Sequence, residues 1–220
     1  MIGEDLYKKA ERLARKADQS NGPLPVKLLR EAAATGYAPA VYALANWHIH
    51  GKGVRKNFKK AFALLRKAAM ERFPPAEYDL AVSYELGHGV EKSRKKAWHY
   101  YRQAANDGDS SARIEVARCY YYGIGTKQNL TKAVEWYTNA AESGDAEAQY
   151  VLGRAYELGE GVKPNVRTAL YWYKKAAAQG DEGAQKALAD LNGLGGESVR
   201  ESVPVTATRR PRTANRSSAQ

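Results

Sequence analysis

The stretch Gly51-Lys52-Gly53-Val54 recurs three more times, as Gly87-His88-Gly89-Val90, Gly123-Ile124-Gly125-Thr126 and Gly159-Glu160-Gly161-Val162. The first glycines of successive copies are 36 residues apart, with no slip in the spacing. A constant period between about 20 and 50 residues is typical of repeat arrays. The spacing therefore predicts a chain built from stacked copies of one structural unit.

Small residues recur in phase with the glycine turn and predict what each unit contains. Alanine stands at 40, 76, 112 and 148 before the turn, and at 61, 97, 133 and 169 after it. Small residues let two helices approach closely while large side chains opposite them fill the space. One helix pair cannot bury such a surface alone, so the units must stack. We therefore predict a helix A before each turn and a helix B after it.

The pattern divides the chain into three parts. Residues 1–35 are predicted to form N-terminal capping helices, one over 4–18 and one from about Val26 to Ala34. Residues 36–192 are predicted to form the repeat solenoid. Residues 193–220 are rich in Ser, Thr, Arg and Pro and have few large apolar side chains. Such a composition predicts a disordered basic tail.

Two places depart from the repeat. Arg72 stands where other B helices are followed by glycine, and a left-handed residue other than glycine costs about 1 kcal/mol or more. We therefore expect a different backbone geometry at Arg72. The last helix is expected to end near Asn192, because three glycines follow it at 193, 195 and 196.

Composition limits the class of protein and its location. Hydrophobic residues make up 44% of the chain, enough for a packed core, but no run of about 18 apolar residues predicts a membrane span. The first residues are acidic and do not resemble a secretory signal. The single Cys119 cannot form an internal disulfide. We therefore expect a cytoplasmic protein without membrane insertion.

The net charge of +11 is unevenly distributed. Residues 36–74 carry eight Lys and Arg against one acid, and residues 193–220 carry five against two. Basic regions attract nucleic acid or acidic proteins. Solvated helix faces are the more common explanation of such a charge excess.

No catalytic or metal-binding constellation is evident. The Gly-x-Gly turns follow no predicted strand and lack the Gly-Lys-Ser/Thr of a phosphate-binding loop. His48 occupies a position that is tyrosine in the other units, so we interpret it as a core residue. Cys119 has no partner base at useful spacing, and the aligned Glu85 and Glu157 lie two repeats apart. We therefore predict no enzyme activity, no metal and no cofactor.

The unit that runs from Ala148 to Gly180 can be compared with known repeats. Its Ala148-Gln149-Tyr150-Val151-Leu152-Gly153-Arg154-Ala155-Tyr156 segment, the Gly159-x-Gly161 turn and Ala169-Leu170-Tyr171-Trp172-Tyr173-Lys174-Lys175-Ala176-Ala177 resemble the Sel1-like repeat, a relative of the tetratricopeptide repeat. The resemblance covers about residues 25–192. It implies an all-α, right-handed α-solenoid of antiparallel helix pairs, with A helices lining a concave face.

The resemblance also implies a function. Members of this family often act as adaptors or scaffolds in bacterial signalling and protein complexes. One branch is secreted, rich in disulfides and described as binding or hydrolysing β-lactams. Units of that branch carry paired cysteines, which this chain lacks.

Helix A positions that vary between units are candidates for a binding groove, because packing does not dictate their identity. Trp47 would anchor one end of this groove, acidic residues would occupy its middle and arginines its other end. Tryptophan and arginine are among the residue types most often found as binding hot spots. Alternatively, Trp47 packs against the N-terminal helices. The candidate partner-binding residues are Asn46, Trp47, His50, Asp79, Val82, Glu115, Arg118, Tyr122 and Arg154.

These observations favour a protein–protein interaction scaffold that binds a peptide or protein partner in its concave groove. The alternative is a nucleic-acid-associated protein, and a β-lactam hydrolase is a third hypothesis that rests on the family branch. We expect a monomer or a weak homodimer. The nucleic-acid hypothesis would use Lys52, Arg55, Lys56, Lys59, Lys60, Arg209, Arg210 and Arg212.

Overall fold

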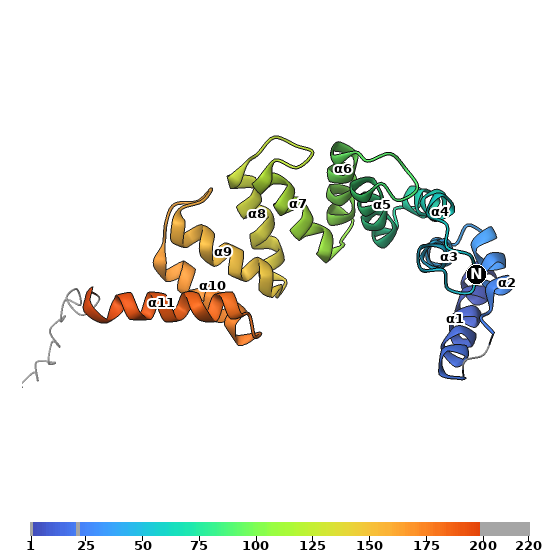
Figure 1. Cartoon of the computed structure of the whole chain (residues 1–220), viewed down its shortest axis with the longest axis horizontal. Coiled ribbons are helices and arrows are strands. Elements are labelled where there is room, and N and C mark those ends of the chain that lie inside the picture. The colour runs from blue at the N-terminus through green and yellow to red at the C-terminus, as the bar shows by residue number, and fades with distance from the viewer. Residues whose placement is uncertain (1, 21–22, 199–220) are drawn as a thin grey trace, which may run out of the picture.

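The computed structural model describes residues 2–20 and 23–198, and all the regular secondary structure within them is helical. Consecutive helices pack against each other and form an arc (Figure 1). This arrangement confirms the predicted all-α solenoid of helix pairs. The helices are α1 (Ile2–Ser20), α2 (Val26–Ala34), α3 (Ala38–His50), α4 (Phe58–Met70), α5 (Pro74–Leu86), α6 (Arg94–Asn106), α7 (Ser110–Tyr122), α8 (Leu130–Glu142), α9 (Ala146–Leu158), α10 (Val166–Ala178) and α11 (Glu182–Ser198).

The A helices of the four units are α3, α5, α7 and α9, and the B helices are α4, α6, α8 and α10. Alanines at the predicted small positions are buried throughout, as at Ala76 and Ala97. Larger side chains fill the space between the helices, and Leu65, Leu80 and Tyr173 are fully buried. The core is therefore a strip that runs along the arc between the two layers of helices.

The predicted helix ends agree with the structure at α2 and differ at the last helix. Helix α11 continues to Ser198, so the expected end near Asn192 is wrong. The three glycines beyond Asn192 lie inside the helix, where each costs about 1 kcal/mol relative to alanine but breaks no backbone hydrogen bond. Residues 199–220 of the predicted tail lie outside the described residues.

The first glycine of each turn ends an A helix. Gly51, Gly87, Gly123 and Gly159 all have φ between +70° and +78°. In this left-handed conformation each N–H donates to the carbonyl four residues earlier, as from Gly51 to Trp47 at 2.8 Å. Glycine adopts this conformation without the steric cost of a Cβ atom.

The second glycine of the turn is required by a contact between units. A Cβ atom on Gly89 would lie 2.2 Å from the carbonyl oxygen of Phe58, and one on Gly125 would lie 2.1 Å from that of Arg94. Phe58 and Arg94 are the first residues of the preceding units' B helices. The turn of one unit therefore rests directly on the backbone of the unit before it.

We expect Gly89→Ala to destabilise the protein more than Gly108→Ala. Both glycines have positive φ, so each substitution costs about 1–2 kcal/mol of backbone strain. A Cβ at Gly108 meets nothing within 4 Å, whereas one at Gly89 overlaps backbone. The additional cost at Gly89 is expected to bring its total to about 3 kcal/mol or more. Urea unfolding of both variants checks this, and equal losses would contradict the contact between units.

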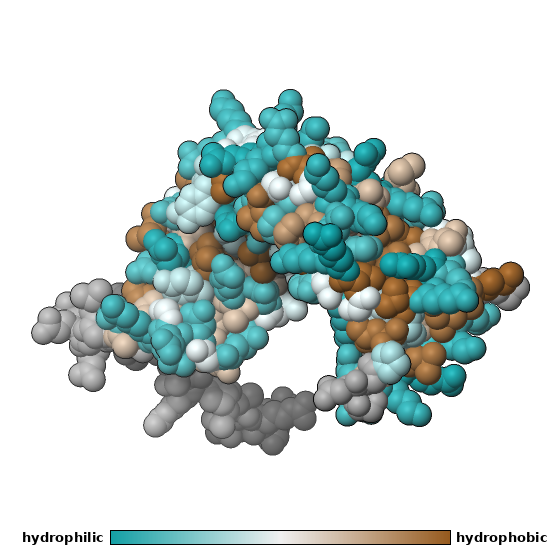
Figure 2. All heavy atoms as spheres, turned by 45° about the vertical axis from the view of Figure 1, so that its right-hand side comes forward, coloured by the Kyte–Doolittle hydropathy of each residue, from teal (hydrophilic) through white to brown (hydrophobic). Residues whose placement is uncertain are grey.

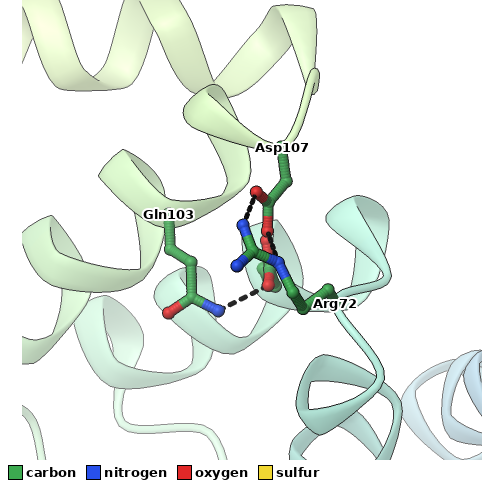
Figure 3. A network of polar contacts seen from close by, with 4 residues as sticks. Arg72, Gln103 and Asp107 are labelled. Carbon is green, nitrogen blue, oxygen red and sulfur yellow. Dashed lines mark hydrogen bonds and ion pairs between the residues drawn. The ribbon is translucent and has the colours of Figure 1, made fainter.

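The expectation of a different backbone geometry at Arg72 is wrong. Its φ is +53°, and its N–H donates to the Ala69 carbonyl at 3.0 Å, as the N–H of Gly108 donates to Ala105. The backbone geometry is therefore shared, although Arg72 is not glycine. Its side chain reaches Asp107 at the end of α6, with Nε donating to Oδ2 at 3.1 Å and the second guanidinium contact on Oδ1 (Figure 3). An ion pair with the next unit thus accompanies the strained conformation.

A buried glutamate lies beside this ion pair. Glu77 is fully buried, and its Oε1 accepts a hydrogen bond of 2.5 Å from Gln103, a residue that Figure 3 places beside Arg72 and Asp107. Its Oε2 has no hydrogen-bond partner among the described residues. Burial raises the pKa of Glu77, and the Asp107 carboxylate raises it further, while Gln103 and Arg72 act in the opposite direction. The ionised form of Glu77 is therefore disfavoured by the fold.

We expect Glu77→Gln to stabilise the protein at neutral pH. Because folding raises this pKa above its ordinary value of 4.5, the glutamate favours the folded state fully below pH 4.5 and loses this contribution as pH rises through the raised pKa. The advantage of glutamine should therefore shrink as pH falls. Thermal unfolding between pH 4 and pH 8 checks this, with the exposed Glu71→Gln as the control. A pH-independent difference would contradict the buried titration.

Candidate functional site

The nine predicted partner-binding residues all lie on A helices, and none of them is buried. They are Asn46, Trp47 and His50 on α3, Asp79 and Val82 on α5, Glu115, Arg118 and Tyr122 on α7, and Arg154 on α9. The structure separates them into local groups rather than one continuous row.

Trp47 lies half-buried against helix α1. It lines a pocket of about 210 Å³ together with Tyr7 and Glu11 of α1. Lys52, which follows α3, donates a hydrogen bond of 2.8 Å to Asp18 and links the same two elements. This position matches the alternative interpretation, in which Trp47 packs against the N-terminal helices.

Four predicted residues converge in a second pocket, on the other side of α3. This pocket, of about 220 Å³, lies between α3 and α5 with the start of α4 beside it. Ring stacking between Phe58 and His88, at 4.2 Å between centroids, forms part of its wall. We call it the α3–α5 pocket; its lining residues are Asn46, Ile49, His50, Phe58, Ala61, Asp79, Val82, Ser83 and His88.

Asp79 supplies the acidic group of the α3–α5 pocket. Burial raises the pKa of its carboxyl group, while a hydrogen bond from Tyr42 and the charge of His50 act in the opposite direction. Burial likewise raises the pKa of Tyr42 to about 12, so this hydroxyl remains a donor at neutral pH. A partly desolvated carboxylate gains from an added donor or cation more than an exposed one does. The pocket is therefore suited to a cationic or amide group.

Arg118 is held within the protein by two carboxylates. Its Nη2 lies 2.6 Å from Oε2 of Glu115 and 3.3 Å from Oε1 of Glu85. Glu85 also accepts a hydrogen bond of 2.6 Å from the buried Tyr101 hydroxyl. Burial raises the pKa of Glu115, against the effect of the Arg118 charge. This cluster links α5, α6 and α7, so Arg118 has a structural role in addition to any contact with a partner.

The hydrogen bond between Tyr101 and Glu85 recurs between Tyr173 and Glu157, at 2.5 Å. The alignment of the two glutamates in the repeat therefore reflects packing within each unit. The sequence contains a signal for this pair, because a glutamate precedes a tyrosine by 16 residues in both units. Tyr42, which contacts Asp79, was likewise missing from the predicted residues.

The A helix position that holds Trp47 faces the core in the other three units. Ser83, Cys119 and Ala155 are all buried there. Burial raises the pKa of the Cys119 thiol to about 12, so it is a neutral thiol at physiological pH. Ser83 donates its hydroxyl proton to the Asp79 carbonyl at 2.8 Å. These positions therefore contribute no reactive group to the A helix surface.

Tyr122 and Arg154 lie further along the arc and are exposed. Tyr122 has 65% of its surface accessible and packs edge-on against Tyr121 at 4.8 Å. Tyr121 in turn donates a hydrogen bond of 2.8 Å to Glu160. Neither Tyr122 nor Arg154 lines the α3–α5 pocket, so the structure does not join them to it.

Residues 2–20 and 23–198 hold no group of three or more His, Cys, Asp and Glu that could coordinate a metal ion. Nor does this part of the chain contain a helix with the length and hydropathy needed to cross a membrane.

The fold and its periodic turns define an α-solenoid of helix-pair repeats. The sequence profile described as Sel1 repeat matches residues 38–72, 74–109, 110–145 and 146–181, each containing one helix pair. The chain belongs to the Sel1 repeat family. Such repeats are typical of protein–protein interaction scaffolds, and Sel1 repeat proteins are generally adaptors without enzyme activity.

Solved structures show the same fold. A protective antigen from uropathogenic Escherichia coli strains, described as displaying an SLR fold, is similar with a TM-score of 0.79 and 32% identity over 88% of this chain and 44% of its own. This chain thus spans less than half of that antigen. A Sel1 repeat protein from Oxalobacter formigenes has a TM-score of 0.66 and 34% identity over 78% of this chain and 68% of its own. Comparison with curated proteins gave no match.

We expect Arg118→Ala to lower the stability by about 1–2 kcal/mol, because it leaves two half-buried carboxylates without their cation. Arg154 occupies the same position of the next unit but is exposed and forms no ion pair with the described residues. Arg154→Ala is therefore the matched control and should change the stability by no more than about 0.5 kcal/mol. Equal effects in urea unfolding would contradict the structural role of Arg118.

Proposed function

We propose that this protein is an interaction scaffold that binds an extended segment of a partner protein on its A helices, with the α3–α5 pocket as the main recognition site. The observation that carries the proposal is the convergence of Asn46, His50, Asp79 and Val82 in this pocket. These positions vary between units, whereas the alanines at 40, 76, 112 and 148 are the same in every unit. The variation is typical of residues that serve recognition rather than packing.

The lining of the pocket favours a lysine or arginine side chain of the partner. Ile49, Phe58 and Val82 offer apolar surface for the aliphatic stem, and Asp79 offers a carboxylate for the charged head. A volume of about 220 Å³ accommodates one such side chain rather than a folded element. Hydrogen bonds to charged groups contribute about 1.5–3 kcal/mol, enough to select a basic residue.

Selection from a random peptide library displayed on phage tests this function. We expect the wild-type protein to enrich peptides that contain lysine or arginine. Asp79→Asn preserves the shape of the pocket but removes the charge. It should lower the affinity for the selected peptides at least tenfold, which corresponds to about 1.4 kcal/mol of binding free energy. The exposed Glu142→Gln, on helix α8, serves as the matched control and should bind as wild type does.

Two results would contradict the proposal. One is equal binding of the selected peptides by the wild type and Asp79→Asn. The other is enrichment of peptides that show no preference for basic residues. Circular dichroism of each variant separates a loss of binding from a loss of fold.

A further inference from the structure

The positive charge of this protein is concentrated on one edge of the solenoid. We call this edge the A–B rim; each segment of it contains a Gly-x-Gly turn and the first residues of the following B helix. The segments hold 13 of the 35 Lys and Arg and only two of the 24 acidic residues, so their net charge equals the +11 of the whole chain. The remaining residues together therefore have no net charge. The A–B rim comprises residues 51–60, 87–96, 123–132 and 159–168.

The basic side chains of the A–B rim are available to a partner. Twelve of the thirteen are exposed, and Lys52, which bonds to Asp18, is the exception. Within the described residues, none of these twelve forms an ion pair with an acid. Of the two acids, Glu160 already accepts a hydrogen bond from Tyr121. The rim therefore presents an almost unopposed positive charge.

Three of the four loops of the A–B rim lie on the outside of the arc (Figure 1). The loops that join α5 to α6, α7 to α8 and α9 to α10 follow the outer curve in Figure 1. In Figure 2, hydrophilic side chains predominate on the upper part of the molecule, above the hollow of the arc. The contacts of the second glycines with the preceding B helices hold adjacent segments together. The charged segments thus form one continuous track, and its last three loops lie on the convex side of the arc (Figure 1).

Several lysines of the A–B rim lie in the first turns of the B helices, where a positive charge lowers the stability of the helix. The helices α4, α6, α8 and α10 have no acidic residue in their first turns. Lys59, Lys95 and Lys132 occupy these turns instead, at the positive end of the helix dipole, which favours anions. The arrangement recurs in four units, whereas the rest of the chain is balanced in charge. A requirement for solubility does not explain this placement, but an anionic partner does.

We propose that the A–B rim is a second interaction surface, which binds an acidic, extended segment of a protein. A flexible chain can follow a convex track across several units, whereas a straight duplex touches a convex curve over a short length. Single-stranded nucleic acid is flexible too, but its binding sites present aromatic side chains for base stacking. On the rim, Phe58 is half-buried between His88 and Lys56, and none of the exposed large hydrophobic residues of the described chain is a rim aromatic.

The charge is strongest at the N-terminal half of the track. The first two segments hold nine of the thirteen basic residues. Ten of the thirteen are lysines, which act as mobile point charges and do not impose a fixed geometry on the ligand. Recognition on the rim is therefore expected to depend on the density of acidic residues in the partner and on salt, with little dependence on its sequence.

Fluorescence anisotropy tests the proposal with two probes, a labelled poly-glutamate peptide and a labelled oligo-deoxythymidine of equal charge. The rim variant combines Lys59→Glu, Lys60→Glu, Lys95→Glu and Lys96→Glu. The control variant has the same net charge but changes exposed lysines elsewhere, with Lys9→Glu, Lys27→Glu, Lys67→Glu and Lys174→Glu. We expect the rim variant to bind poly-glutamate at least about tenfold more weakly at low salt, and the control to lose no more than about threefold.

The outcomes separate the alternatives. Equal losses in both variants would show that only net charge matters, which overturns the proposal. Tighter binding of oligo-deoxythymidine than of poly-glutamate, abolished in the rim variant, would assign the rim to nucleic acid and overturn the proposed partner. The rim variant should remain folded, because glutamate at a helix N-terminus is favourable. Asp79→Asn should keep the binding of poly-glutamate, so the proposed function and the rim can fail independently.

Discussion

The close approach between the second glycine of a turn and the backbone of the preceding B helix, found at Gly89, Gly125 and Gly161, determines how the units of this protein are placed. Gly89 and Gly125 leave no room for a Cβ atom, because the backbone at Phe58 and Arg94 occupies that space. The contact is formed by backbone on both sides, so it transmits position without depending on flexible side chains. The first glycine of the turn ends the A helix, and the second allows the loop to pack closely against the preceding unit.

Both candidate interaction surfaces follow from this contact. Fixing the loop fixes the end of one helix and the start of the next, so neighbouring A helices are held side by side while the basic turns follow one another along an edge. The α3–α5 pocket places a half-buried carboxylate, Asp79, among apolar side chains. The A–B rim places exposed cations at four helix N-termini. The two surfaces thus differ in the sign of their charge and in the degree of their burial.

Polar contacts between units supplement the packing. Arg72 adopts a left-handed conformation and reaches Asp107, 35 residues away. Arg118 is held by Glu85 of the preceding unit and by Glu115 of its own helix. Arg72 occupies a position that holds glycine after the other B helices, whereas the position of Arg118 varies between units. Residues that are not common to all units therefore also help to hold the solenoid together.

Much of the architecture could be predicted because it is local and periodic. The period of 36 residues, the left-handed glycines and the buried alanines depend on backbone conformation and side-chain size, which a repeat displays several times. The caps of the B helices were not predicted, although Asn57, Ser93 and Asn129 each accept a hydrogen bond from the third helical residue. The end of α11 was predicted wrongly, because glycine inside a helix costs too little to terminate it.

The sequence by itself therefore determined the helix pairs, their order and the positions free to vary. Only the tertiary structure decided which of those residues meet. It brought Asn46 and Asp79 together in one pocket, turned Trp47 toward helix α1 and engaged Arg118 with carboxylates. The physical reason is that contacts between units depend on how neighbouring helices pack and on which rotamers fit. A repeat period specifies neither of these for the side chains that differ from one unit to the next.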